Sequence, residues 1–527
     1  MPTGPESPSP TRHRPMPERD RLPHALYRAE QVRHLDRRAI DHHGLPGLTL
    51  MERAGTEAYR LLRTRWPHAR RLVVLVGTGN NGGDGLVIAR LAQADGLNVR
   101  VLRFGDPARM RGDAATNHQR WLDSAGRSEP FTSTPRHADV LVDAVLGTGL
   151  ERPLTGHWVT AFAAINAGST PVMAVDMPSG LDADTGRVMG AALRAAVTVS
   201  FIGLKQGLFI GAGPEYAGDI HFRALGIPAV VYASEVASAR RIDWHQQGSR
   251  LGRRPRTAHK GDFGQVLVIG GAPGMSGAVL LAGTAALRAG AGRVTLATHP
   301  AHAAYLNVAR PELMVAGVAG VADLEPLLAR CDVVAIGPGL GQTDWARELW
   351  QRVNRLDQPL VVDADALNLL AQAPLARADW VLTPHPGEAA RLLGSATARI
   401  EQDRPAAVRA LQARYGGVVC LKGAGTLVQG ESPRPFAVCS DGNPGMATAG
   451  TGDLLTGIIA ALRAQGLDAE EAAAAGVCLH AAAGDWAARA GERGLIAGDL
   501  LAAIRWVANH DARASAPSAG HSSPDGI

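Results

Sequence analysis

Short, uninterrupted runs of valine, leucine and isoleucine recur along the chain, and longer stretches rich in alanine and leucine separate them. Strands that are covered on both faces are apolar throughout instead of alternating, and helices connect such parallel strands in α/β proteins. The pattern therefore predicts an α/β fold with parallel sheets. The runs expected to be strands are residues 72–76, 99–104, 140–145 and 172–175 in the first half, and 266–269, 293–297, 333–336, 360–362 and 418–421 in the second.

Between the halves, residues 240–258 form a polar, charged run without an apolar face. A chain of 527 residues has room for two large α/β domains, because a domain takes about 150 residues or more. We expect a flexible linker here, so the two domains should work independently. The predicted segments are a disordered tail at 1–24, a domain at 25–240, a linker at 241–256, a domain at 257–512 and a second disordered tail at 513–527.

Composition excludes several classes of protein. Hydrophobic residues make up 46% and charged residues 20%, as in ordinary soluble globular proteins. There is no run of about 20 apolar residues and no secretion signal, so we expect a cytoplasmic protein without a membrane partner. Four cysteines without CxxC spacing argue against a disulfide framework and a zinc site. The net charge of +5 comes with two arginine-rich stretches that hold a single aromatic residue, Trp244, which predicts no nucleic-acid partner.

Lysine is rare in this chain. Only Lys205, Lys260 and Lys422 occur among 54 lysine and arginine residues. An ammonium is a compact charge, whereas a guanidinium is a planar fork. Since arginine has replaced lysine nearly everywhere, the remaining lysines are candidates for sites that need the compact charge.

In the first half, a glycine-rich segment at 77–85 separates the apolar run at 72–76 from an apolar helix at 86–94. Its GxGxxG spacing is typical of a dinucleotide site at a helix N-terminus, where free N–H groups favour phosphates. However, the segment also carries two asparagines and an aspartate. The next strand ends in RFGD, where a ribose-binding acid is expected. The sequence therefore does not favour a nicotinamide dehydrogenase.

Two further strand ends carry polar clusters, one beginning at Asp143 and one at Asp176. A carboxylate after an apolar strand is costly unless it has a partner or a cation. Asn81, Asp143 and Ser179 together could hold a hard cation, and Asp176 could act as a general acid or base. The alternative is that these acids only cap the following helices. Three polar clusters in one domain favour a site.

The sequences GNNGGDG, DAVLGTGL and VDMPSGLDADTG, together with LMERAG at 50–55, resemble the NAD(P)H-hydrate epimerase family. The resemblance covers about residues 25–240 and implies a Rossmann-like, three-layer α/β/α domain. It implies a catalytic Asp176 and a potassium ion held by Asn81, Asp143 and Ser179. The implied substrate contacts are Asn80, Asn81, Gly82, Gly83, Asp84, Gly147, Thr148, Gly149, Leu150, Glu151, Arg152, Pro153 and Asp176.

Lys205 lies where that family usually has a lysine after a late strand. Two roles stay open for it, a contact to a substrate phosphate and a structural ion pair.

The second half also places glycine-rich turns after its apolar runs, but it has no GxxxxGK[ST] sequence, which excludes a Walker-type nucleotide site. Residues 450–453 open an apolar helix at 454–462, so their N–H groups are placed for a phosphate. Phosphoryl transfer to a hydroxyl needs a base, an anion cradle and usually a divalent metal. Asp453 is the candidate base. The candidate Mg²⁺ neighbours are Asp363, Asp365 and Glu388, and His385, between two prolines, is expected to contact a ligand.

The sequences KGDFG, TPHPGE, KGAGT and GNPGMATAGTGD resemble the ribokinase-like NAD(P)H-hydrate dehydratases, over residues 257 to about 510. The resemblance implies a ribokinase-like α/β domain. It implies that the hydrated nucleotide contacts Ala278, Gly337, Gly339, Gly341, His385 and Asp453, and that the adenine nucleotide contacts Lys422, Gly423, Ala424, Gly425, Thr426 and Gly452.

An epimerase fused to a dehydratase is similar to the bifunctional NAD(P)H-hydrate repair enzymes. The resemblance implies an isomerase that interconverts the R and S hydrates of NADH and NADPH, followed by a lyase that phosphorylates the S hydrate and releases NAD(P)H. ADP is the donor in bacterial-type members and ATP in others, with Mg²⁺, and ADP gives AMP and phosphate as products. We also expect a homo-oligomer.

Two other functions stay open. One is a ribokinase-like kinase of a small molecule such as a vitamin precursor, with the first half as a regulatory nucleotide-binding module. Release of a stable phosphorylated product would distinguish it. The other is a scaffold, although a scaffold need not keep Asn81, Asp143, Asp176 and Ser179.

Overall fold

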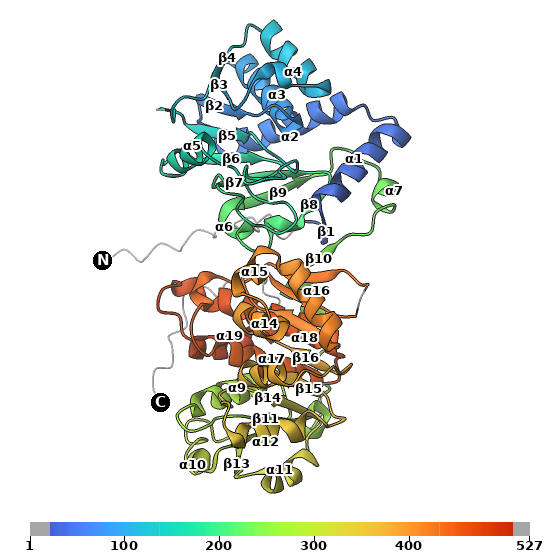
Figure 1. Ribbon diagram of the computed structural model, residues 1–527, viewed down its shortest axis with the longest axis vertical. Coiled ribbons are helices and arrows are strands. Elements are labelled where there is room, and N and C mark those ends of the chain that lie inside the picture. The colour runs from blue at the N-terminus through green and yellow to red at the C-terminus, as the bar shows by residue number, and fades with distance from the viewer. Residues whose placement is uncertain (1–21, 136, 432, 510–527) are drawn as a thin grey trace, which may run out of the picture.

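The computed structural model describes residues 22–135, 137–431 and 433–509. Two lobes lie one above the other along the longest axis, the N-terminal half above and the C-terminal half below (Figure 1). The predicted tails lie outside the described residues, apart from residues 22–24. There Leu22 is buried in an apolar cluster and His24 contacts the carbonyl of Arg241, so this end of the predicted tail belongs to the fold.

The upper lobe is built on a seven-stranded sheet in which every neighbouring pair is parallel. The four apolar runs of the first half are all strands of this sheet, which confirms their prediction. In spatial order the strands are β4 (Ser128–Pro130), β3 (Asn98–Arg103), β2 (Arg71–Val76), β5 (Val140–Ala144), β6 (Val172–Val175), β7 (Val197–Phe201) and β9 (Asp219–Arg223).

Helices cover both faces of this sheet, because successive side chains of each strand point to opposite sides. In β2, Val74 and Val76 join a cluster with α1, α2 and α3, whereas Val73 and Leu75 join a cluster with α5. The result is the predicted three-layer α/β/α arrangement. The helices of this half are α1 (Ala29–His43), α2 (Gly47–Arg65), α3 (Asn80–Ala94), α4 (Gly112–Asp123), α5 (His157–Asn166), α6 (Gly213–Ala217) and α7 (Ala229–Tyr232).

The lower lobe is built on a second sheet of twelve strands, in which the apolar runs of the second half are again strands. From β13 to β17 the neighbours are parallel, and β17, β18 and β19 pair antiparallel. These strands are, in spatial order, β13 (Met314–Gly317), β12 (Arg293–Thr298), β11 (Gln265–Ile269), β14 (Val333–Ile336), β15 (Leu360–Val362), β16 (Trp380–Leu382), β17 (Val418–Leu421), β18 (Thr426–Gln429) and β19 (Phe436–Cys439).

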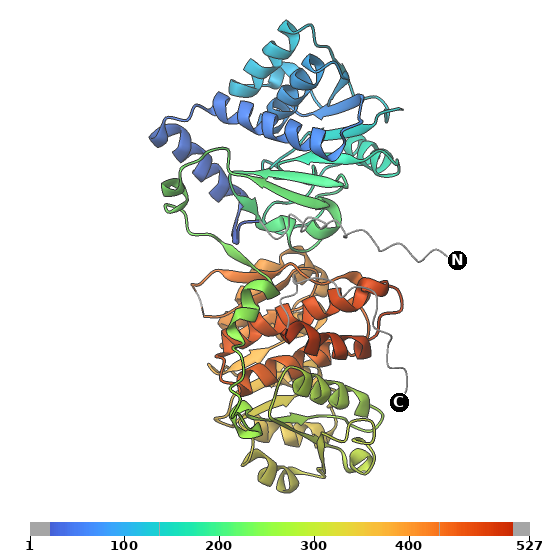
Figure 2. The same cartoon turned by 180° about the vertical axis from the view of Figure 1, so that it is seen from behind.

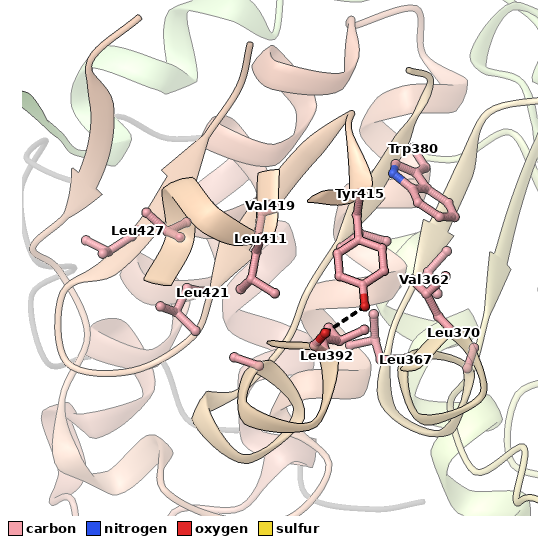
Figure 3. Packing of buried hydrophobic residues seen from close by; sticks show 14 of the residues in the cluster. Val362, Leu367, Leu370, Trp380, Leu392, Leu411, Tyr415, Val419, Leu421 and Leu427 are labelled. Atoms are coloured by element: carbon pink, nitrogen blue, oxygen red, sulfur yellow. Dashed lines mark hydrogen bonds between the residues drawn. The ribbon is translucent and has the colours of Figure 1, made fainter. Parts of the chain in front are cut away.

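Two apolar clusters fill the lower lobe, one on each face of its sheet. Figure 3 shows part of one of them, where Tyr415 packs with Val362 and Trp380 and donates a 2.7 Å hydrogen bond to the carbonyl of Leu392. The helices are α8 (Trp244–Gln247), α9 (Ser276–Arg288), α10 (Pro300–Ala303), α11 (Val321–Leu328), α12 (Asp344–Val353), α13 (Ala364–Gln372), α14 (Pro386–Leu393), α15 (Thr397–Gln402), α16 (Arg404–Tyr415), α17 (Thr451–Ala464), α18 (Ala469–Ala487) and α19 (Ala497–Asn509).

Three strands from the N-terminal half complete the lower sheet. β10 (Ala239–Ile242) pairs parallel with β19, β1 (Ala25–Tyr27) pairs antiparallel with β10, and β8 (Leu204–Lys205) pairs parallel with β1. The two lobes are therefore joined by continuous backbone hydrogen bonding, and β8 is the last strand of the lower sheet.

The segment expected to be a solvated linker, 241–256, differs from that expectation at its start. Ile242 and Trp244 are buried, and the indole Nε1 of Trp244 donates a 3.0 Å hydrogen bond to the carbonyl of Val507. Arg241 is also buried and pairs with Asp243 at 3.2 Å. The apolar residues of β10 stand next to arginines in the sequence, so no continuous apolar run marks this strand. From β10 the chain continues along the lower lobe (Figure 2).

Within the described part of the chain, none of the helices combines the length and the apolar character that a membrane span requires.

Candidate functional site

The upper lobe has a cavity of about 580 Å³ at the carboxyl ends of its strands. Ligands of open parallel sheets bind at this edge, against helix N-termini. Several predicted residues meet in this cavity. They are Asn80, Asn81, Asp84, Gly147, Thr148, Gly149 and Asp176, and Lys205 lies with them.

Asp176 and Lys205 form an ion pair in this cavity. Asp176 follows β6 with a φ of 65°, a conformation that costs a residue with a side chain and that often marks a functional position. The fully buried Lys205 donates from Nζ to a carboxylate oxygen of Asp176, and also to Ser200 Oγ at 3.2 Å and the carbonyl of Phe201 at 3.0 Å. Of the two roles left open for Lys205, the structure therefore contains the ion pair, and the contact to a substrate phosphate stays a prediction.

Two further carboxylates line the cavity, Asp36 from α1 and Asp113 from α4. Burial raises the pKa of Asp36, and Asp176 and Asp113 raise it further. Burial also raises the pKa of Asp84 well above its usual range, with Asp176 and Asp36 adding to the effect. Burial and repulsion from neighbouring carboxylates therefore disfavour the charged forms of Asp36 and Asp84.

Sequence reasoning missed Asp36 and Asp113, although Asp36 left a signal. It lies four residues after the buried Val32, on the helix face that also buries Leu35 and Ala39. An acid on an otherwise apolar helical stripe needs a polar partner or a cavity.

Of the predicted cation ligands, Asn81 lines the cavity, whereas Asp143 and Ser179 are not among its lining residues. Asp143 is fully buried and accepts hydrogen bonds from Ser179 N at 2.7 Å and Ser179 Oγ at 2.5 Å. Burial raises its pKa to about 6, and these hydrogen bonds oppose the rise. Both amide atoms of Asn81 are buried without a hydrogen-bond partner. A potassium ion that takes the Asn81 oxygen as a ligand would satisfy that oxygen, whereas both oxygens of Asp143 already accept hydrogen bonds from Ser179.

Some predicted substrate contacts are not among the residues that line the cavity. Two of them are Gly82 and Gly83, where a Cβ would lie 2.2 Å from the carbonyl oxygen of Gly77 and 2.5 Å from the sulfur of Met51, respectively. The end of the GTGLERP segment also lies outside the residues that line the cavity. These residues are Leu150, Glu151, Arg152 and Pro153.

The lower lobe assembles its site around Lys422, which follows β17. Its Nζ lies 2.8 Å from Asp363 Oδ1 and 3.8 Å from Glu388 Oε2. The other oxygen of Asp363 accepts a 2.7 Å hydrogen bond from Thr456 Oγ1 on α17. The strand ends of β15, β16 and β17 are thus tied to the first turns of α17.

Asp453 lies in the first turn of α17, next to this network. Burial raises its pKa to about 7, and the negative charges of Asp363, Asp365 and Glu388 contribute while Lys422 opposes the rise. α17 begins after Gly450, whose φ of 92° suits glycine. A Cβ on Gly452 would lie 3.3 Å from Lys422 Nζ, so this lysine lies close to the free amides of the helix.

His385 begins α14 and is tied to Glu388. Its backbone N–H donates to Glu388 Oε2 at 2.7 Å, and its Nδ1 accepts a 2.9 Å hydrogen bond from Gly387 N. Burial and the charge of Lys422 lower the pKa of the ring, which is half exposed. The imidazole of His385 therefore lies half exposed, with its charged form disfavoured.

The GPGLG turn at residues 337–341 lies against other residues that the sequence predicted for the site of this lobe. A Cβ on Gly337 would lie 1.8 Å from the carbonyl oxygen of Asp363, and one on Gly339 would lie 3.1 Å from Ala278 Cβ. Gly341 N donates a 2.8 Å hydrogen bond to Asp365. All three glycines have positive φ, so the turn requires them.

The predicted Mg²⁺ neighbours do not fit a metal ligand set. Asp363 accepts from Lys422 and Thr456, Glu388 from His385, and Asp365 from Gly341. No group of three histidine, cysteine, aspartate or glutamate side chains among the described residues could hold a metal ion.

Sequence reasoning also missed Arg404, which begins α16 and is fully buried. Its guanidinium donates to the carbonyls of Leu421 at 3.2 Å, Lys422 at 3.3 Å and Ala424. Burial lowers its pKa to about 10. Arg404 therefore shapes the loop 422–426, and no spacing in the sequence marks this arginine among the many others.

Comparisons with known proteins agree with the two lobes. The family described as NAD(P)H-hydrate dehydratase matches residues 266–505, and the family described as YjeF-related protein N-terminus matches residues 47–207. The Bifunctional NAD(P)H-hydrate repair enzyme Nnr of Coxiella burnetii is 46% identical over 92% of this chain and 99% of its own length. The Escherichia coli protein of the same name is 43% identical over 93% and 95%.

Solved structures resemble the lower half of the chain. One is an ADP/ATP-dependent NAD(P)H-hydrate dehydratase from Bacillus subtilis, co-crystallised with ATP and Mg²⁺, 28% identical over 50% of this chain and 95% of its own, with a TM-score of 0.45. Another is a ribokinase-like superfamily protein from Enterococcus faecalis, 30% identical over 51% and 95%, with a TM-score of 0.48. On the identity and coverage of the full-length relatives, this chain belongs to the family of bifunctional NAD(P)H-hydrate repair enzymes.

Proposed function

We propose that the two lobes carry out the two steps of NAD(P)H-hydrate repair, with an epimerase domain at residues 25–240 and a dehydratase domain at 257–512. The substrates are the hydrates of NADH and NADPH and an adenine nucleotide, and we expect the enzyme to act in the cytoplasm as a homo-oligomer. The observation that carries the proposal is a carboxylate and a lysine at the carboxyl edge of each sheet. In the upper lobe Asp176 pairs with the buried Lys205, and in the lower lobe Asp453 lies within the electrostatic influence of the half-buried Lys422.

In the upper lobe, Asp176 takes the proton of the ring hydroxyl. The hydroxylated carbon is bonded to both oxygen and the ring nitrogen, so loss of this proton allows the carbon–nitrogen bond to break, giving an aldehyde while the nitrogen takes up a proton. Closure on the other face reverses these transfers and gives the other epimer. Lys205 keeps the carboxylate in place, and Asp84 and Asp36, whose pKa values are raised, are further proton carriers beside it.

Potassium is proposed for the set of Asn81, Asp143 and Ser179, and it would supply positive charge near the substrate. The unpartnered amide of Asn81 supports this placement. The remaining predicted contacts of GTGL with the substrate stay proposals, with Gly147, Thr148 and Gly149 favoured because they line the cavity.

In the lower lobe, Asp453 takes the proton of the ring hydroxyl of the S hydrate as the hydroxyl oxygen attacks the terminal phosphoryl group of the nucleotide. With ADP, the bond to the leaving AMP breaks and a phosphorylated ring forms. The lone pair of the ring nitrogen then expels phosphate, and the neighbouring carbon loses a proton to restore the double bond. A pKa of about 7 suits a base that must accept a proton near neutral pH.

The nucleotide is proposed to lie against the loop 422–426 and Gly452, with ADP as the favoured donor and ATP as the alternative. Since the nearby carboxylates already accept protein donors, Mg²⁺ is proposed to arrive on the phosphates of the nucleotide, as it often does. Ala278, the GPGLG turn and His385 surround the hydrated ring.

The test is product analysis with purified S hydrate of NADH, Mg²⁺ and either ADP or ATP. We expect one NADH and one phosphate for each nucleotide consumed, with AMP formed from ADP. A stable phosphorylated product without NADH would instead support a small-molecule kinase, and binding without turnover would support a scaffold.

A further inference from the structure

One short segment of the upper lobe reaches both sites. It begins in β8 with Lys205, whose ammonium pairs with Asp176, and continues through the turn Gln206–Leu208 to Phe209 and Ile210. At its other end it meets the loop 422–426 of the lower lobe. A Cβ on Gly425 would lie 2.0 Å from the carbonyl oxygen of Phe209 and 3.1 Å from the Cα of Ile210.

Gly425 cannot be replaced by a residue with a side chain without strain at this contact. Its φ is 66°, so both its conformation and the space beside it require glycine. The backbone of the upper lobe therefore packs directly against the backbone of this loop.

The loop is also held by Arg404. Three carbonyls, those of Leu421, Lys422 and Ala424, accept hydrogen bonds from this one guanidinium. Since Arg404 comes from α16 of the lower lobe, the loop contacts both a buried arginine of its own lobe and the 209–210 backbone of the other.

The contact is embedded in a shared core. Leu208, Phe209 and Ile210 belong to the same buried apolar cluster as Val408 of α16 and Leu427 of β18. The cluster continues from one lobe to the other, so the segment is packed as firmly as the interior of a single domain.

We infer that residues 205–210 are a seat for the nucleotide-binding loop, so that the upper lobe helps to set the affinity of the lower lobe for adenine nucleotide. This rests on the proposed function of the loop 422–426. The two domains are then not independent, contrary to the expectation from the linker. Residues 209 and 210 act as positioning residues, because they touch the loop and not the reacting atoms.

A seat predicts a specific kinetic change. Loosening it lets the loop shift, which weakens nucleotide binding, while Asp453 on α17 keeps its place. The KM for ADP should rise with the dehydratase kcat retained. A merely structural role would lower the amount of active protein without moving KM.

The experiment uses the full chain with Ile210→Ala, whose side chain is fully buried at the seat, and Ile165→Ala as the matched control. Ile165 is equally buried in the upper lobe but lies on α5, in a cluster that contains no residue of the lower lobe. ADP binding is measured by calorimetry, KM and kcat by the return of NADH absorbance from the S hydrate, and folding by thermal unfolding.

We expect Ile210→Ala to raise both the ADP dissociation constant and the KM about fivefold or more, the low end of typical coupling between sites. Ile165→Ala should leave both within about twofold, a change worth under 0.5 kcal/mol. Equal values for wild type and Ile210→Ala would overturn the inference. If the alanine variant does not fold, Ile210→Val should raise the KM by more than the roughly twofold range allowed for the control, and a KM within that range would also overturn the inference. If wild type binds neither ADP nor ATP, the proposed function fails together with the seat.

Discussion

The two sites use lysine and aspartate in different ways. In the upper lobe the ammonium of Lys205 bonds directly to Asp176, the carboxylate that we place on the substrate. In the lower lobe Lys422 bonds to Asp363, a neighbour, and leaves the candidate base Asp453 without that bond. Burial and the carboxylates around Asp453 then raise its pKa to about 7.

This difference suits the two reactions. In the epimerase reaction, ring closure gives back each proton that ring opening removes. A carboxylate that an ion pair holds in place is therefore a sufficient acid and base for this reaction. The dehydratase step removes the hydroxyl proton while a phosphoryl group is transferred, and a carboxylate with a raised pKa is a stronger base for it. Changing either carboxylate should therefore stop one reaction and leave the other.

The largest effect is expected from Asp453→Asn, which keeps the shape of the side chain but removes the base. The dehydratase kcat should fall by about 10²–10⁴-fold, the usual contribution of a general base. The measurement is the initial rate of NADH return from purified S hydrate with ADP and Mg²⁺.

The epimerase is the internal control for that variant. Interconversion of the hydrates, followed by chromatography, should proceed at the wild-type rate. A dehydratase rate within tenfold of wild type would contradict the role given to Asp453.

Next in size is Lys205→Met, which removes the ammonium but keeps the length of the side chain. We expect the epimerase rate to fall about 100-fold, because Asp176 loses the partner that holds it, while the dehydratase kcat stays within about twofold. Chromatographic epimerisation rates test this. An unchanged epimerase rate would show that the ion pair does not position Asp176.

The effect of pH on the dehydratase rate should be smaller, and only a lower pH should reduce that rate. The pKa of Asp453 is raised, so its basic form is lost as the pH falls through about 7, and the dehydratase rate should fall about tenfold for each unit below that. Asp363, Asp365 and Glu388 raise this pKa and Lys422 opposes the rise. A rate that stays constant from about pH 5 to 8 with the S hydrate would exclude this ionisation.

The smallest effect concerns the junction between the lobes. Trp244→Phe removes the hydrogen bond to the carbonyl of Val507 and should lower the free energy of unfolding by about 0.5–1.5 kcal/mol. Trp486→Phe is the matched control, because its buried Nε1 has no hydrogen-bond partner among the described residues. Urea unfolding compares the two, and equal losses would mean that the bond does not contribute.

The parallel strands could be predicted because they are buried on both faces and therefore appear as continuous apolar runs. The strand β2 is found at Arg71–Val76 where residues 72–76 were expected, and β14 at Val333–Ile336 as expected. The loop end that carries Asp176 followed from these strands, since ligand sites of parallel sheets lie at their carboxyl edge. Asp453 followed instead from the apolar helix that residues 450–453 open.

The parts of the site and of the junction that could not be predicted depend on contacts between distant parts of the chain. Arg404 lies 18 residues from Lys422 in sequence and looks like any other arginine until α16 is packed against the loop. The junction was misread for a related reason, because Ile242 and Trp244 stand among charged residues and are buried by partners that are distant in the sequence, such as β19 and α19. No local pattern in the sequence indicates such distant partners.

The most direct test follows the return of reduced-nicotinamide absorbance from a mixture of R and S NADH hydrates with ADP and Mg²⁺. We predict that wild type restores the whole mixture, that Asp176→Asn stops at the S fraction apart from slow spontaneous epimerisation, and that Asp453→Asn restores none. If wild type also stops at the S fraction, or restores nothing with either ADP or ATP, the assignment of two chemistries to these two sites is contradicted.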